Sequence, residues 1–185
     1  MCKRLSNWLG RVSTGWVTLS ALVIFALFTA LVLPGQSAKA PGDGSSPDLS
    51  LFYSAGDLYD MAESYGPEGR QAYVRARFTF DLVWPLVYTF FLVTAVSWVF
   101  RRAFAPESRW QRANLFPVLA ALFDYLENVS TSLVMLRFPA RTPIVDLLAP
   151  VFTFSKWAFL GASFVLLLAG VGVAVWERVS TRKAT

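Results

Sequence analysis

Four long apolar runs separate the polar stretches of this chain. They cover about residues 16–33, 78–100, 115–136 and 149–175. About 20 apolar residues in a helix cross the hydrocarbon core of a bilayer. A segment in lipid must also satisfy its own backbone hydrogen bonds, which a helix does. The pattern therefore predicts an all-α fold, a bundle of four transmembrane helices that forms a single integral membrane domain over residues 1–185.

The first apolar run has a second interpretation. A basic N-terminus, an apolar run and then Ala38-Lys39-Ala40 resemble a signal peptide with an A-x-A cleavage site. The run is longer than the usual apolar region of a signal peptide, which favours a retained helix. After cleavage the mature protein would begin near Pro41 and keep three spans. In both cases the next segment, 34–77, lies outside.

The outer segment begins with a linker rich in Pro, Gly and Ser, residues 34–50. Ser54 and Asp57 then have the spacing of a capping box, with Asp in place of the usual Glu. The apolar positions that follow share one face of a helix: Leu58, Met61, Ala62 and Tyr65. We predict a short amphipathic helix that lies on the outer surface or covers the mouth of the bundle. A solvated surface helix is the alternative.

Proline and glycine predict irregularities in the later spans. Gly66-Pro67 begins a new helix that enters the membrane near Phe78. Pro85 predicts a kink or local unwinding of that helix. The last apolar run, 147–176, is longer than the hydrocarbon core, so it must protrude, tilt or break. Small residues four apart, among them Gly170 and Ala174, allow a neighbouring helix to approach closely.

Composition and charge agree with a multi-pass protein of the cell membrane. Hydrophobic residues make up 55% of the chain and charged residues 16%, with a net charge of +5. Most of the 17 Lys and Arg residues lie in the N-terminus, in segment 101–112 and in the C-terminal tail. The positive-inside rule then places both termini in the cytoplasm. A basic excess of this kind reflects orientation, so no nucleic-acid partner is predicted.

The third run carries a polar stripe. Its members recur at i, i+3, i+4 and i+7: Asp124, Glu127, Asn128 and Thr131. This spacing puts them on one face of a helix. Charged side chains within a span are costly, and they indicate a functional site by default. Two carboxyls one turn apart at low dielectric do not both ionise unless a cation lies between them.

Basic residues at similar depth are the candidate counter-charges. Lys156 is the basic residue deep within a span, and it lies in the outer half, where Glu127 also lies. We predict that Lys156 pairs with the acids of the third span; the alternative is that it snorkels to the surface. Arg77 and Asp81 form an i, i+4 pair near the outer interface. Arg70 lies on the same helix face as this pair.

The residue inventory limits the chemistry. The chain has no histidine, which excludes His-ligated haem and zinc and a His general base. No cofactor is predicted, although a hard cation could bind the carboxylate and amide oxygens. Catalytic residues and metal ligands stay unassigned. Asn128-Val-Ser130 matches a glycosylation sequon, but it lies inside a predicted span.

Residues 50–160 resemble a group of small four-helix bacterial integral membrane proteins of uncharacterised function. The resemblance rests on GPEGRQAYVRARFTFDLVWPLVY and, in the next span, FPVLAALFDYLEN. It implies four helices and an outer amphipathic segment, and no activity. It points to a set of positions in this chain: Gly69, Arg70, Tyr73, Asp81, Pro85, Asp124, Glu127 and Asn128.

Three functions are compatible with these patterns. The leading hypothesis is a non-catalytic membrane protein whose acidic intramembrane pocket opens to the outer side and binds a cation, a proton or a small amphipathic ligand. It could be an accessory subunit, with the lipid bilayer, another membrane protein or a second copy as partner. The alternative is a lipid-active enzyme that uses Asp124 and Glu127 as acid/base or metal ligands. A structural subunit is the third, in which the acids contact only protein.

Overall fold

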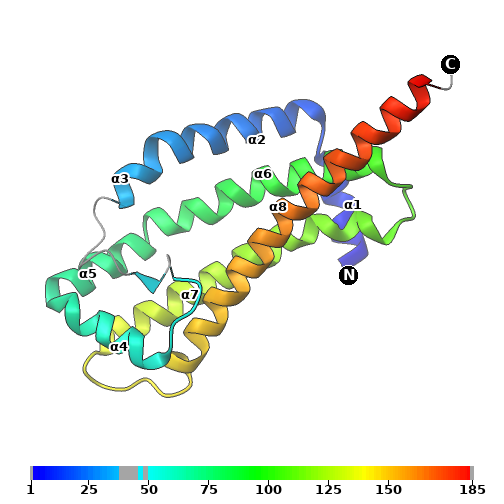
Figure 1. Cartoon of the computed structure of the whole chain (residues 1–185). Helices are drawn as coiled ribbons and strands as arrows, with labels where there is room; N and C mark the ends of the chain where they lie inside the picture. The colour runs from blue at the N-terminus through cyan, green and yellow to red at the C-terminus, as the bar shows by residue number, and fades with distance from the viewer. Residues whose placement is uncertain (1, 38–45, 48–49, 184–185) are drawn as a thin grey trace. The chain divides into compact units, whose positions relative to one another are not determined.

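The computed structural model describes residues 2–37, 46–47 and 50–183 (Figure 1). Regular secondary structure in these residues is helical, without a strand. The α-helices are α1 (Cys2–Val12), α2 (Gly15–Leu27), α3 (Leu33–Ser37), α4 (Ala55–Ser64), α5 (Gly66–Arg77), α6 (Phe80–Ala103), α7 (Phe116–Arg137) and α8 (Val145–Lys183). The described residues also contain a π-helix, η1 (Phe28–Val32), and a 3₁₀ helix, η3 (Arg109–Leu115). The predicted cleavage motif at 38–40 lies outside the described residues.

Four helical stretches are long and apolar enough to cross a membrane. They are Gly15–Gly35, Gly66–Ala103, Arg109–Arg137 and Val145–Ser180. Each contains one of the predicted spans. By length and composition, the four predicted helices are therefore confirmed.

The second and fourth spans differ from the sequence prediction in detail. Helix α6 stays helical through Pro85, so the predicted local unwinding there is wrong. The helical path breaks earlier, at Phe78 and Thr79. Pro85 lies in the second turn of α6, where it removes a single backbone hydrogen bond to the first turn. That loss does not interrupt the helix.

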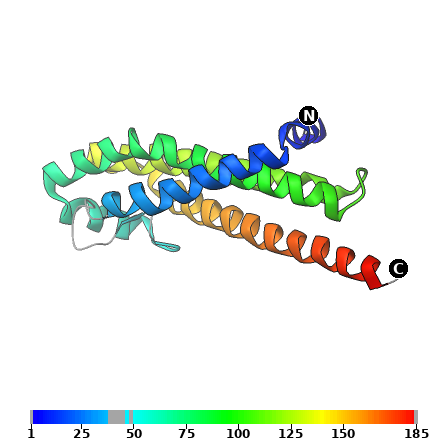
Figure 2. The same ribbon diagram turned by 90° about the horizontal axis from the view of Figure 1, so that it is seen from above.

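Helix α8 is one unbroken helix of 39 residues that contains Pro150 (Figures 1 and 2). At about 1.5 Å per residue its length is roughly 58 Å. Of the three predicted outcomes for this long apolar run, a break is thus wrong. A helix of this length tilts within a bilayer or protrudes from it.

The chain divides into two compact units, and the long helices α6, α7 and α8 contribute to both. The first unit contains residues 1–26, 87–119 and 159–185. Its buried core includes Val96, Val99 and Phe100 of α6. A Cβ atom at Gly170 would lie 2.5 Å from Phe100 Cε2. The predicted close helix approach at Gly170 is therefore confirmed.

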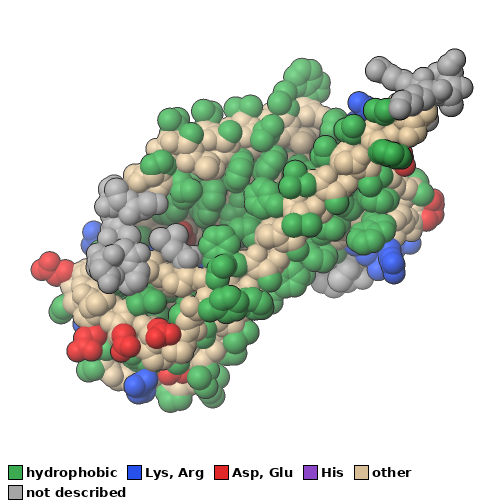
Figure 3. All heavy atoms as spheres, viewed as in Figure 1, with side chains coloured by type: hydrophobic (Ala, Val, Ile, Leu, Met, Phe, Trp, Pro, Cys, Tyr) green, Lys and Arg blue, Asp and Glu red, His purple; other side chains and the backbone are tan. Residues whose placement is uncertain are grey.

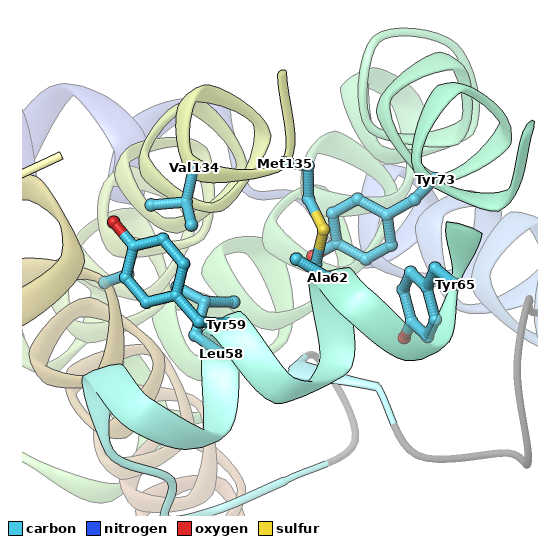
Figure 4. Close-up of a cluster of buried hydrophobic side chains, with 8 residues drawn as sticks. Leu58, Tyr59, Ala62, Tyr65, Tyr73, Val134 and Met135 are labelled. Carbon is cyan, nitrogen blue, oxygen red and sulfur yellow. The ribbon is translucent and has the colours of Figure 1, made fainter. Parts of the chain in front are cut away.

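The second unit contains residues 27–86 and 120–158, and its core lies beneath α4 (Figure 4). Leu58, Tyr59 and Ala62 of α4 are buried, and they lie against Val134 and Met135 of α7. Helix α4 begins with a complete capping box between Ser54 and Asp57. The predicted amphipathic helix is thus confirmed, and it packs on the core of this unit. The solvated alternative is wrong.

Helices α2 and α8 expose apolar side chains over much of their length (Figure 3). In the most apolar parts of the stretches Gly15–Gly35 and Val145–Ser180, only 6% and 11% of the residues are buried. Exposed members on α2 include Trp16, Leu22 and Ile24, and those on α8 include Val151, Val165 and Leu168. Apolar surfaces of this extent are rare on soluble monomers.

Candidate functional site

Helix α7 buries its polar stripe in the second unit. Asp124 is 6% exposed and Glu127 is 0% exposed, and Asn128 and Thr131 are also buried. The opposite face of α7 exposes apolar side chains: Leu122, Leu126, Val129, Leu133 and Leu136. The helix is therefore amphipathic, but it buries its polar, acidic face and exposes its apolar face, the reverse of a helix on the surface of a soluble protein. The predicted interior orientation of Asp124, Glu127 and Asn128 is confirmed.

Lys156 of α8 is the counter-charge of Glu127. Its Nζ lies 2.5 Å from Glu127 Oε2, and Lys156 is 5% exposed. The predicted ion pair is confirmed, and the snorkelling alternative is wrong. Lys156 lies on the buried face of α8 with Ala149 and Thr153, at i, i+4 and i+7. That register directs the ammonium group to α7 instead of the surface.

Tyr73 connects the Arg77–Asp81 pair with the Glu127–Lys156 pair. Its hydroxyl donates a hydrogen bond to Thr131 Oγ1 at 3.2 Å, and Thr131 donates to the backbone carbonyl of Glu127 at 2.9 Å. The guanidinium of Arg77 lies 4.5 Å from the centre of the Tyr73 ring. Arg77 Nε lies 3.0 Å from Asp81 Oδ2, which confirms the predicted i, i+4 pair. Residues of α5, α6, α7 and α8 therefore form one polar network.

Asp124 is held by an amide. Asn128 Nδ2 donates to Asp124 Oδ1 at 3.4 Å, across one turn of α7. The oxygen of the same amide, Asn128 Oδ1, is buried and accepts no hydrogen bond from the described residues. Rotation about the Cβ–Cγ bond of Asn128 would exchange the amide nitrogen and oxygen and present the oxygen to Asp124. Asn128 can thus bind either an ionised or a protonated carboxyl.

Arg70, one of the candidate counter-charges, contacts α4 and the residue that follows α7. Its guanidinium donates to the backbone carbonyl of Ala62 at 2.8 Å and lies 4.7 Å from the centre of the Phe138 ring. Arg70 therefore anchors the C-terminal part of α4, and no ion pair in the described residues joins it to Asp124 or Glu127. The shared helix face of Arg70 and Arg77 did not predict that the two side chains have different partners.

The sequence interpretation missed a second polar group near the start of α8. The hydroxyl of Tyr59 lies 3.3 Å from Asp146 Oδ2 and accepts a hydrogen bond from the backbone N–H of Thr142 at 2.7 Å. Arg141 covers the Tyr59 ring at 4.2 Å from its centre. An Asp in the first turn of a helix is a common stabilising feature, so its position alone gave no sign of a contact with α4.

Metal and cavity geometry limit the chemistry of the acid cluster. Within the described parts of the chain, no group of three or more His, Cys, Asp or Glu side chains could hold a metal ion. A cavity of about 210 Å³ is present in the first unit, and residues of η3, α7 and α8 line it. None of the polar-stripe residues contributes to that cavity.

Comparisons with protein-family models, with curated proteins and with solved structures gave no match for this chain.

Proposed function

We propose that this chain is a multi-pass integral membrane protein whose buried charge network holds an exchangeable proton at Asp124. The four apolar helices and the exposed apolar faces of α2 and α8 support a membrane location. The excess of Lys and Arg in the N-terminus, the 101–112 segment and the tail supports cytoplasmic termini. This arrangement puts Asp124 near the middle of the third span, where water is scarce.

The hydrogen bond between Asn128 and Asp124 carries the proposal. Asn128 Nδ2 donates to Asp124 Oδ1 at 3.4 Å, and the buried oxygen of the same amide accepts no hydrogen bond from the described residues. Asp124 is buried on the same face of α7 as Glu127. Two carboxyls one helical turn apart at low dielectric favour a proton on one of them, and the Asn128 amide can bond a protonated carboxyl through its oxygen.

A proton suits this geometry better than a larger ligand. Glu127 is completely buried and in contact with Lys156, which closes it to a head group or a lipid substrate. The Asn128 amide keeps a hydrogen bond with Asp124 in both protonation states, once it turns over. Proton exchange at Asp124 thus requires little rearrangement. A general acid–base role in lipid chemistry would require a carboxyl that reaches its substrate.

Infrared difference spectroscopy of the purified protein in lipid vesicles tests the proposal. A pH change should alter the carbonyl band of a protonated carboxylic acid, and Asp124→Asn should remove that band. The matched control is Asp60→Asn, which removes an exposed carboxylate from α4. A band that disappears when Na⁺ or K⁺ is added would identify a competing cation at the same site. A pH response that Asp124→Asn leaves unchanged would refute the proposal.

A further inference from the structure

The 3₁₀ helix η3 aligns two arginines on one side. Arg109 and Arg112 are three residues apart, and a 3₁₀ helix has three residues per turn, so their side chains are eclipsed. Both side chains are exposed. Within the described residues neither of them pairs with an acidic side chain. The geometry thus concentrates two guanidinium groups without a protein carboxylate to balance them.

A second side of η3, which carries Gln111 and Asn114, is hydrogen-bonded to its surroundings. Gln111 Nε2 donates to the backbone carbonyls of Phe100 and Phe104 at 3.1 and 3.0 Å. Asn114 Nδ2 donates to Ser97 Oγ at 2.9 Å and to the carbonyl of Ser6 at 3.0 Å. These bonds join η3 to α6 and α1. The arginine pair is therefore presented by a rigid element.

A cavity of about 210 Å³ lies beside the arginine pair. Its lining combines charge and apolar surface: Arg109, Trp110, Arg112, Ala113, Phe116 and Leu166. Phe116 begins α7 and Leu166 lies on α8. A ligand with a compact anion at one end and an apolar part at the other is complementary to such a lining. Guanidinium groups bind phosphate through parallel hydrogen bonds.

We propose that this cavity binds the phosphate head group of an anionic phospholipid, with the start of an acyl chain against Phe116 and Leu166. The inference rests on the proposed membrane location, which puts η3 at the cytoplasmic surface. Anionic lipids are enriched there, and basic pockets between transmembrane helices bind their head groups. Trp110, which is 46% exposed, has the amphipathic ring that is typical of this interface.

Native mass spectrometry of the full chain with added phosphatidylglycerol or phosphatidylcholine of equal chain length tests the site. Arg109→Gln with Arg112→Gln should weaken phosphatidylglycerol binding roughly 25-fold, because each arginine near an anionic surface contributes about fivefold. Phosphatidylcholine binding should be unaffected. The matched control, Arg4→Gln with Arg11→Gln, removes the same charge from the same predicted side and should keep phosphatidylglycerol affinity. An equal loss in the control would indicate general surface attraction and overturn the proposal.

A second variant and a soluble probe separate the remaining outcomes. Leu166→Trp fills the cavity without altering charge, and it should weaken phosphatidylglycerol binding as well. If inorganic phosphate displaces the lipid and binds the Leu166→Trp variant with unchanged affinity, the site recognises free phosphate and the lipid proposal is wrong.

Carbonate extraction of membranes reports separately on the proposed function. Release of the wild-type protein by carbonate would refute the membrane location itself.

Discussion

At the scale of single residues, the pair of Glu127 and Lys156 has the largest energetic consequences. Both side chains are buried and their charged atoms are in contact. Removing both charges from such a pair is often nearly neutral, whereas removing one leaves an uncompensated charge. The folded protein therefore loses stability when either partner is removed alone, even where the net contribution of the intact pair to folding is small.

Lys156→Met should lower the stability of the folded protein by about 3–5 kcal/mol, because Glu127 then lacks its partner. Glu127→Gln should also be destabilising. The double variant should lose less unfolding free energy than the two single variants lose in sum. The difference measures the coupling between the two side chains. Thermal unfolding in detergent, followed by circular dichroism, provides the comparison.

Arg75→Met is the control for the loss of a positive charge, since Arg75 is exposed on α5. It should change the stability little. Strictly additive effects of Lys156→Met and Glu127→Gln would contradict the coupling that the ion pair implies.

At the scale of elements, α4 shows how a local signal and a tertiary contact act together. Asp57 N donates to Ser54 Oγ at 3.2 Å, and Asp57 Oδ2 accepts from Ser54 N at 2.7 Å and Oγ at 2.9 Å. These bonds start the helix. Its buried face, with Leu58 and Ala62, then lies on the core of the second unit. A ten-residue helix is marginal in isolation, so the packing maintains what the cap begins.

The capping box should respond to acid. The backbone N–H and the hydroxyl of Ser54 bond the carboxylate of Asp57, and they lower its pKa below the ordinary value of 3.8. A lowered pKa means that the stabilisation is complete above about pH 4 and is lost as the pH falls through the folded-state value. Hydrogen–deuterium exchange of the α4 amides, corrected for intrinsic exchange, should therefore show reduced protection in acid.

Two variants make this prediction specific. Asp57→Asn should remove the pH-dependent part of the protection, whereas Asp60→Asn should retain it, because Asp60 takes no part in the cap. Ser54→Ala should reduce protection of α4 at every pH, by about 1 kcal/mol. A pH response that persists in Asp57→Asn would assign the effect to another group.

At the scale of the whole molecule, the distribution of Lys and Arg and the apolar faces of the long helices both support a four-span topology. The N-terminus, segment 101–112 and the tail carry most of the basic residues. The acids of segment 34–77 instead lie on the side predicted to face outward. The positive-inside rule uses this difference between short loops.

Cysteine labelling of intact cells tests the topology. With Cys2 replaced by serine, a cysteine at Ser64 should react with an impermeant reagent added outside, and a cysteine at Glu107 should react only after lysis. Both positions are exposed, and Glu107 is preferred to Ser108 because Ser108 caps η3. Labelling of Glu107→Cys from outside would show that the orientation is the reverse of the predicted one.

Local patterns in the sequence were sufficient to predict the four helices, the capping box of α4 and the inward face of α7. Each depends on neighbours within a few turns: apolar length, the Ser54–Asp57 spacing, and the recurrence of Asp124 and Glu127 on one helical face. The pairing of Lys156 with Glu127 also followed, because charges at equal depth in a membrane have few partners. These are short-range or one-dimensional constraints.

Only the tertiary structure decided which residues meet across helices. It gave Arg70 and Arg77 different partners, although both share a helix face: Arg70 donates to the carbonyl of Ala62 in α4, and Arg77 pairs with Asp81. It brought Tyr73 to Thr131 and placed Leu166 of α8 and Arg109 of η3 in the lining of one cavity. Such contacts depend on the rotation of each helix about its axis, which is determined by packing between side chains distant in sequence. A periodic pattern identifies a buried face but does not specify the neighbour that covers it.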